Sequence, residues 1–221
     1  MTLKCSVSFF FAIVSYYAHG QALHLYKIQA HTDPFKTTWA DSVYMFPTFQ
    51  EGKITFMTGF SPEQDLKLNY NLYFGQMDFI NSKGDTLQIK PAPTIKLVNI
   101  GKHWFLYDPK KGYIELLVQS QVALGVLTVM RTERMDYVSG TIPPGQSADI
   151  RSLPSVYDRY YSVRETYYLI DNKNRLFKAM QSTLVKLFPV KRAAIKAYIS
   201  THHTDFTKRA DLIELLAFCH Q

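Results

Sequence analysis

Cysteine is scarce in this chain of 221 residues, which contains only Cys5 and Cys219. Cys5 lies in an N-terminal segment that is typical of a cleaved signal, so the mature chain keeps one cysteine. It can then form no intrachain disulfide and no metal site built on cysteine pairs. Cys219 stands at helical spacing from Leu212, Leu215 and Leu216, and we expect it to be buried. Pairing with the cysteine of a second chain is the alternative.

Long hydrophobic runs are also lacking. The N-terminal run "CSVSFFFAIVSYY" has about 13 residues, fewer than the ~20 that cross a bilayer, and no second long run follows. Lys4 precedes this run and "AHG" follows it, as in a secretory signal over residues 1–20. A membrane anchor is the alternative. We predict export to the periplasm or the extracellular space, a mature chain that begins near Gln21, and no transmembrane segment in it.

The signatures of common enzyme classes are missing as well. The chain has no glycine-rich loop ending in Lys-Ser or Lys-Thr, no G-x-G-x-x-G, no G-x-S-x-G and no H-E-x-x-H. A phosphate-binding loop, a nucleophile elbow and a zinc-protease helix are therefore not indicated. The sequence gives no reason to expect a cofactor.

Charge is uneven along the chain. The formal net charge is +7, but residues 21–171 contain 15 basic and 15 acidic residues, while residues 172–221 contain 9 basic and 3 acidic ones. The basic C-terminal helices therefore have the charge to contact an anionic surface, and a solvated helix face is the alternative. Nucleic acid is not expected as a partner, because the basic residues and the aromatic residues fall in different segments.

Strand-like runs separated by turns fill the middle of the chain. The segments "TIKLVNI", "WFLYD" and "YIELLVQS" are separated by "GKH" and "PKKG", and "RYYSVRETYYLID" and "RLFKA" flank "NKN". Turns about every 8 to 12 residues are typical of an antiparallel sandwich or barrel. We also predict a hairpin in which "SVYMFPTF" and "KITFMTGF" flank a "QEGK" turn at Gly52. Residues 139–155 are rich in proline and predict an exposed loop.

The final forty residues change to a helical period. "STLVKLF", with Ser182 as its cap, "VKRAAIKAYIS" and "TKRADLIELLAFCHQ" predict about three short helices. The fold class predicted is α+β, mainly antiparallel β, as a sandwich or a barrel-like meander. Its parts are a signal peptide (1–20), a β domain (21–180) and a helical C-terminal segment (181–221) packed on the β domain or on itself.

The stretch "LKLNYNLYFGQMDFINSKGDTL" carries the clearest alternation. Its apolar residues alternate up to Phe74 and then change phase, which predicts a turn or bulge at Gly75 and a second turn around Asp85. Asn69 and Asn71 then share one face of the first strand, and Asp78 is expected to face solvent. Asn69 and Asn71 are candidate ligand-binding residues if that face is open.

Tyrosines supply the second candidate binding site. Tyr160 and Tyr161 belong to a run of five tyrosines in one predicted hairpin. Exposed tyrosines stack on sugars or anchor protein partners, and buried ones form ordinary cross-strand pairs. We take Tyr160 and Tyr161 as candidate ligand contacts.

Two further groupings are candidates for chemistry. His202, His203 and Asp205 in "THHTDF" are weak candidate metal ligands, since adjacent residues of a turn diverge and no further ligand is indicated. A glycosidase needs two carboxyl groups about 5 to 9.5 Å apart. The acidic residues on or near predicted strands are Asp78, Asp85, Glu115 and Asp136.

A resemblance to known proteins rests on three stretches: "EGKITF", "LNYNLYFGQMDFINSKGDTLQI" and "LVKLFPVKRAAIKAYISTHHTDFTKRADLIELLAF". Through them the chain resembles a group of uncharacterised exported proteins of Bacteroidota-type bacteria. It implies an envelope or extracellular location and a β-rich body with a helical tail, and it implies no activity. We predict a noncatalytic exported module that binds a protein or glycan or supports an envelope assembly; a glycan-directed envelope hydrolase with paired carboxylates is the alternative.

Overall fold

The computed structural model describes residues 26–28, 43–61, 65–90, 94–133 and 159–221. The predicted signal peptide and the proline-rich segment 139–155 lie outside the described residues. The strands are β1 (Tyr26–Ile28), β2 (Gln50–Phe56), β3 (Leu66–Asn71), β4 (Gln76–Ile80), β5 (Thr86–Gln88), β6 (Ile95–Ile100), β7 (His103–Asp108), β8 (Gly112–Val118), β9 (Ala123–Glu133), β10 (Arg159–Ile170) and β11 (Leu176–Lys178). The helices are α1 (Gln181–Leu187), the short 3-10 helix η3 (Pro189–Lys191), α2 (Arg192–His202) and α3 (Arg209–His220).

All of these strands join one antiparallel sheet of eleven strands. Its order is β1-β10-β9-β8-β7-β6-β2-β3-β4-β5, and β11 also pairs with β10. Strands β6 to β10 follow one another as in a meander, because turns such as those at Gly101 and Gly112, both at positive φ, reverse the chain. The predicted α+β fold, mainly antiparallel β, is confirmed, and the sheet is open.

The sheet curls until one of its ends packs on its middle. The ring of Tyr70 on β3 lies 5.7 Å from that of Phe105 on β7 and 6.3 Å from that of Tyr113 on β8. The backbone N–H of Met130 on β9 donates to the carbonyl of Leu72, which follows β3, at 2.8 Å. Burial of these large side chains drives the curl. This first core holds residues from β2, β3, β4, β6, β7, β8, β9 and β10.

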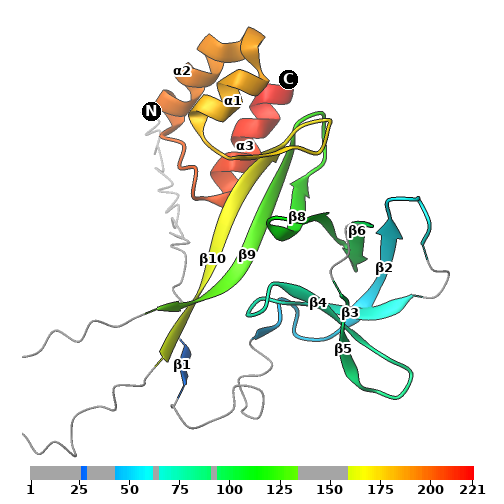
Figure 1. Ribbon diagram of the computed structural model, residues 1–221. Helices are drawn as coiled ribbons and strands as arrows, with labels where there is room; N and C mark the ends of the chain where they lie inside the picture. The colour runs from blue at the N-terminus through cyan, green and yellow to red at the C-terminus, as the bar shows by residue number, and fades with distance from the viewer. Residues whose placement is uncertain (1–25, 29–42, 62–64, 91–93, 134–158) are drawn as a thin grey trace, which may run out of the picture.

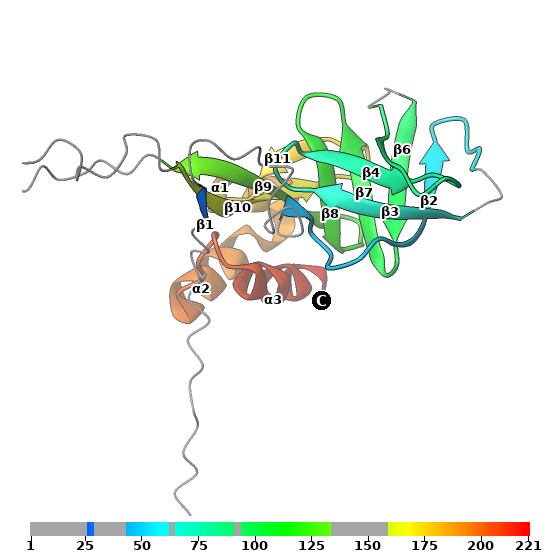
Figure 2. The same cartoon turned by 90° about the horizontal axis from the view of Figure 1, so that it is seen from below.

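A second core lies between the helices and the strands β9 and β10. Its members include Leu124 and Val126 on β9, Leu169 on β10 and Leu215 and Leu216 on α3. Figures 1 and 2 show α1, α2 and α3 gathered on one side of β9 and β10. The helical segment therefore packs both on itself and on the sheet. None of the helices in the described part of the chain is both long and apolar enough to span a membrane.

The predicted hairpin with its turn at Gly52 is wrong. Residues 50–56, "QEGKITF", form the continuous strand β2, and Gly52 pairs with Leu66 of β3 on one side and Ile100 of β6 on the other. A Cβ atom at this position would lie 2.1 Å from the carbonyl oxygen of Asn99. Gly52 is therefore needed for close approach of two backbones inside a sheet, not for a turn.

The prediction for residues 66–87 holds for the chain path but not for Asp78. Gly75 adopts a φ of 66°, and its N–H donates to the carbonyl of Asn71, which closes the turn between β3 and β4. Gly84, at a φ of 87°, lies in the next turn. Asp78 is only 4% exposed, so the expectation that it faces solvent is wrong. Segment 43–46 covers its side of the sheet.

The three predicted helices are present with small changes. Ser182 does not cap α1, because Met180 takes the N-cap position and Ser182 lies within the first turn. Pro189 follows the end of α1 and begins η3, where its missing N–H leaves no donor unsatisfied. Cys219 is buried among the helices, as expected, with 2% of its surface exposed.

Candidate functional site

Asn69 and Asn71 are both buried and act within the fold. Asn69 Oδ1 accepts from the N–H groups of Phe46, at 3.1 Å, and Tyr70, at 2.9 Å, while its Nδ2 donates to the carbonyl of Phe46 at 2.8 Å. Asn71 Oδ1 accepts from the N–H groups of Tyr73 and Phe74 in the following turn. The face that carries both amides is thus covered by segment 43–46 rather than open to a ligand.

Asp78 lies beside these asparagines in a small polar network. Its Oδ2 accepts from the hydroxyl of Tyr44 at 3.0 Å and from Nδ2 of Asn71 at 3.2 Å, and its Oδ1 accepts from Nε2 of Gln76 at 3.1 Å. Burial and the neighbouring carboxylate raise the pKa of Tyr44 to about 12. With Tyr44 protonated, three side chains donate to the two oxygens of this carboxylate, which is buried within the fold.

Tyr161 belongs to the core rather than to an exposed binding face. It is 3% exposed, and its ring lies 5.7 Å from that of Tyr73. Tyr160 and Tyr161 pair through their backbones with Lys27 and Tyr26 of β1. Asn71 and Tyr161 both contact Tyr73, but Asn69, Asn71 and Tyr161 are all buried, so these candidates offer no open binding site.

His202, His203 and Asp205 diverge around the end of α2. The His202 ring stacks on that of Tyr198 at 3.9 Å, and its Nδ1 lies 3.0 Å from the Tyr198 carbonyl. His203 ends the helix with a φ of 50°. Asp205 accepts from the hydroxyl and the N–H of Thr207, which lower the pKa of its carboxyl. No group of three His, Cys, Asp or Glu residues that could hold a metal occurs in the ranges described above.

A cluster of ionisable groups joins α3 to the sheet. Glu115 on β8 is 4% exposed; its Oε1 lies 2.6 Å from Nδ1 of His103 on β7, and its Oε2 lies 3.5 Å from Nη2 of Arg209 at the start of α3. The same Nη2 lies 2.8 Å from Oε1 of Glu165 on β10. The hydroxyl of Tyr167 donates to the other oxygen of Glu165. One guanidinium therefore neutralises two carboxylates from strands on either side of β9.

The electrostatics of this cluster favour a structural role. Burial opposes the charge of Arg209, but Glu165 and Glu115 outweigh it and raise the pKa of the guanidinium. Burial, followed by the contact with Glu165, raises the pKa of Tyr167 well above its usual range. Each charge has a partner, and Glu115 is almost inaccessible. The arrangement holds the first turn of α3 on the sheet.

The acidic residues selected from the sequence do not pair with one another as a hydrolase requires. Asp78 and Glu115 each have the partners described above, and Asp85 lies in an exposed turn where its Oδ2 accepts from Asn81. Asp136 lies outside the described residues. The carboxylate that does approach Glu115 is Glu165, which the sequence analysis did not select. Glu115 and Glu165 both contact Nη2 of Arg209, but neither residue lines the pocket described below.

Ser120 and His220 form a contact that resembles a nucleophile and its base. Ser120 lies in the turn between β8 and β9, and its Oγ is 2.7 Å from Nε2 of His220 at the end of α3. Ser120 Oγ and His220 Nε2 also lie 2.6 Å and 3.1 Å from the carbonyl oxygen of Val122. A carbonyl only accepts, so both groups donate to it and Nε2 carries its proton. In this arrangement His220 is not a base for Ser120, and the contact ties α3 to the hairpin.

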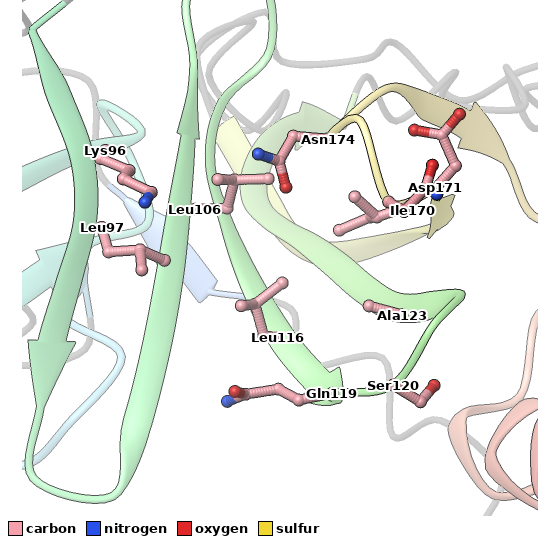
Figure 3. A pocket seen from close by; sticks show the side chains of 11 residues that line it. Lys96, Leu97, Leu106, Leu116, Gln119, Ser120, Ala123, Ile170, Asp171 and Asn174 are labelled. Atoms are coloured by element: carbon pink, nitrogen blue, oxygen red, sulfur yellow. The ribbon is translucent and has the colours of Figure 1, made fainter. Parts of the chain in front are cut away.

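A pocket of about 220 Å³ opens on the other side of the sheet. Leu124 pairs with Leu169 on the face under the helices, so the neighbouring pair Ala123 and Ile170 points the opposite way. We call this the outer face. Figure 3 shows the pocket there, and its lining comes from the five neighbouring strands β6 to β10 and from the turns that follow β8 and β10. Its lining consists of Lys96, Leu97, Leu106, Leu116, Gln119, Ser120, Ala123, Ile170, Asp171, Asn172 and Asn174.

The pocket combines an aliphatic floor with a polar rim. Leu97, Leu106, Leu116, Ala123 and Ile170 supply the apolar surface. The rim comes from Lys96 and from polar residues of the turns that follow β8 and β10. No sequence motif marks this site, so it was not predicted. The available signal was the presence of apolar residues on both faces of β7 and β8, as in "WFLYD" and "YIELLV".

Comparison of the chain with protein-family models, with curated proteins and with solved structures found no match. Function is therefore inferred from the geometry of the pocket and of the charge cluster.

Proposed function

We propose that this protein is an exported, noncatalytic module that binds a protein partner on the outer face of its sheet. The observation that carries the proposal is the pocket over β6 to β10, where apolar side chains line a concave surface that the helices do not cover. A concave apolar surface with a few polar groups at its rim is the usual form of a recognition site. The buried charge cluster, in contrast, stabilises the fold.

The lining favours a protein over a glycan as the partner. Sugar rings stack on flat aromatic side chains, and the described residues that line the pocket include no Tyr, Trp, Phe or His. Aliphatic floors suit the side chains of a partner chain. The function needs no cofactor.

A peptide library tests this proposal. Random peptides are selected on three immobilised targets: the full wild-type chain, Ala123→Trp and Val129→Trp. In Ala123→Trp the introduced indole ring fills the floor of the pocket. Val129 is a matched control because it lies on the same strand and face, six residues away and outside the pocket lining. We expect enrichment on the wild type and on Val129→Trp, with loss on Ala123→Trp. Enrichment that is unaffected by Ala123→Trp, or binding only to a glycan panel screened in parallel, would contradict the proposal.

The location is part of the proposal and rests on the signal-like pattern of residues 1–20. Fractionation of the producing cells, followed by N-terminal sequencing of the protein recovered, tests it. We expect a mature N-terminus near Gln21 in the periplasmic or extracellular fraction. Recovery of the full chain in the cytoplasm would contradict export.

A second proposal concerns contact between the helices and an anionic surface, favoured by the surroundings of Val190. This side chain is 97% exposed, and Lys186, Arg192 and Lys196 nearby in the sequence are exposed and have no ion-pair partner in the described part of the chain. Lys191 is excluded from this group because its Nζ donates to the carbonyl of Cys219. Reversal of Lys186, Arg192 and Lys196 to Glu should abolish salt-sensitive binding to anionic vesicles. Unchanged binding would contradict this role.

A further inference from the structure

The pocket on the outer face has a single charge without a partner. Lys96 is exposed, and its ammonium group makes no ion pair or hydrogen bond with any described residue. Asp171, the acidic residue in the lining, is already neutralised: Nε and Nη2 of Arg175 lie 2.7 Å and 2.6 Å from its Oδ2, and the bond from Arg175 holds its pKa below the usual range. The pocket is therefore complementary to a ligand that carries one negative charge.

The neutral groups at the rim divide into used and free donors. The hydroxyl of Ser120 is occupied by Val122 and His220. The side-chain amides of Gln119, Asn172 and Asn174 are exposed and have no hydrogen-bond partner among the described residues. Three amides and one ammonium therefore remain to bind oxygen atoms of a ligand.

The size of the pocket limits what enters it. Sites for drug-sized molecules have volumes of about 300 to 1,000 Å³, and this pocket has about 220 Å³. It is suited to a single side chain of a longer ligand. The leucine-rich floor favours an aliphatic side chain, because burial of its methyl groups against Leu97, Leu106 and Leu116 supplies most of the free energy of binding.

We infer that the pocket binds the C-terminal residue of a partner polypeptide that ends in Leu, Ile or Val, with the terminal carboxylate paired to Lys96. A C-terminal residue carries an aliphatic side chain and a carboxylate on the same Cα, so one residue satisfies both the floor and the charge. The free amides at the rim donate to the second carboxylate oxygen and to the preceding carbonyl. This inference rests on the proposed function and names the chemistry that the site recognises.

Titration of the full chain with two matched peptides tests the inference. The peptides are acetyl-Gly-Ser-Gly-Ser-Leu with a free C-terminus and the same sequence with a C-terminal amide, and binding is followed through backbone amide resonances. We expect the free acid to shift resonances of Leu97, Leu116, Ala123 and Asn174, and the amide to bind about two- to fivefold more weakly, the range of an exposed ion pair. Lys96→Gln should lower the affinity for the free-acid peptide to that for the amide peptide, and should leave the affinity for the amide peptide unchanged.

Two variants separate this inference from the proposed function. Ala123→Trp should remove binding of both peptides, while Val129→Trp should preserve it, and the dispersion of the resonances reports that each variant is folded. Equal affinity for acid and amide, no response to Lys96→Gln, or no binding of either peptide overturns the inference. The proposed function survives that result if library peptides of another sequence still depend on Ala123, and fails if none do.

Discussion

Arg209, the first residue of α3, and Glu165 on β10 form an ion pair in which Nη2 and Oε1 lie 2.8 Å apart. The same nitrogen lies 3.5 Å from Oε2 of Glu115 on β8. One side chain of the helical layer is thus bound to two strands that flank β9. Because the strands belong to the sheet and Arg209 to the C-terminal segment, this contact fixes where α3 meets the β body.

Removal of the guanidinium should destabilise the fold. In Arg209→Met, Glu115 stays buried, with 5% of its side chain exposed, and loses its cation. Loss of one partner of a buried pair costs about 3–5 kcal/mol, and we expect about 2–4 kcal/mol here because Arg209 is partly exposed. Urea unfolding followed by circular dichroism measures the change.

The neighbouring residue provides the control for Arg209. Lys208 pairs with Asp205 at 4.0 Å on the surface, with 59% of its side chain exposed, so Lys208→Met should change the free energy of unfolding by less than about 0.5 kcal/mol. The cost of Arg209→Met should also shrink when Glu115 and Glu165 are both replaced by Gln. Equal losses for the Lys208 and Arg209 variants would show that the pair with Glu165 contributes nothing.

Gly52 should tolerate no side chain. In Gly52→Ala the new Cβ would lie 2.1 Å from the backbone oxygen of Asn99, so β2 and β6 must separate. We expect a loss of more than about 3 kcal/mol or failure to fold. Gly59→Ala is the comparison, because Gly59 has a φ of +82° with no described atom within 4 Å of the new Cβ. That change should cost only about 1–2 kcal/mol of backbone strain. Similar thermal midpoints for the two variants would contradict this account.

The difference between these glycines also shows what the sequence predicts and what it does not. Gly75 and Gly84 follow runs with clear alternation, so local phase and turn chemistry located both turns correctly. Gly52 sits in "QEGK", which has the same local chemistry as a turn. Its role depends on β6, more than forty residues away, and no local pattern contains that information. Alternation predicted the strands and the helical period predicted the helices, but only the structure shows which strands lie side by side in the sheet.

The candidate sites were harder to predict for the same reason. Asp78 alternates with apolar neighbours and was expected in solvent, yet Tyr44, 34 positions earlier, covers it. Arg209 and Glu165 are 44 positions apart, and Ser120 and His220 are 100 apart. Contacts at such separations depend on how the sheet curls and where α3 docks. The pocket on the outer face depends on them too, because Ser120 and Ile170 approach each other only through the pairing of β8, β9 and β10.

Asn69 should be among the residues on which the fold depends most. In Asn69→Ala, both the N–H and the carbonyl of Phe46 lose their partner in a buried position. Buried backbone groups without partners cost about 1–3 kcal/mol each, and we expect a total loss of about 2–4 kcal/mol in urea unfolding. Asn81→Ala is the control, since Asn81 accepts from Lys83 and Asp85 in an exposed turn and should cost about 1 kcal/mol or less. A smaller loss at Asn69 than at Asn81 would contradict the role in holding segment 43–46.

Cys219 should be unreactive while the chain is folded. Burial raises the pKa of its thiol to about 11 from an ordinary value of 9.0, so at pH 8 the reactive thiolate is almost absent and the sulfur is covered. Ellman's reagent should label Cys219 slowly in buffer and at once in guanidinium chloride, with Cys219→Ala reporting the signal that belongs to Cys5. The unfolded chain releases the thiol proton near pH 9 and the folded chain near pH 11, so the contribution of Cys219 to stability is present below pH 9 and is lost as the pH rises toward 11. The urea midpoint should therefore fall further between pH 8 and pH 10.5 in the wild type than in Cys219→Ala. Rapid labelling of the folded chain at pH 8 would contradict the packing of Cys219 beneath the helices.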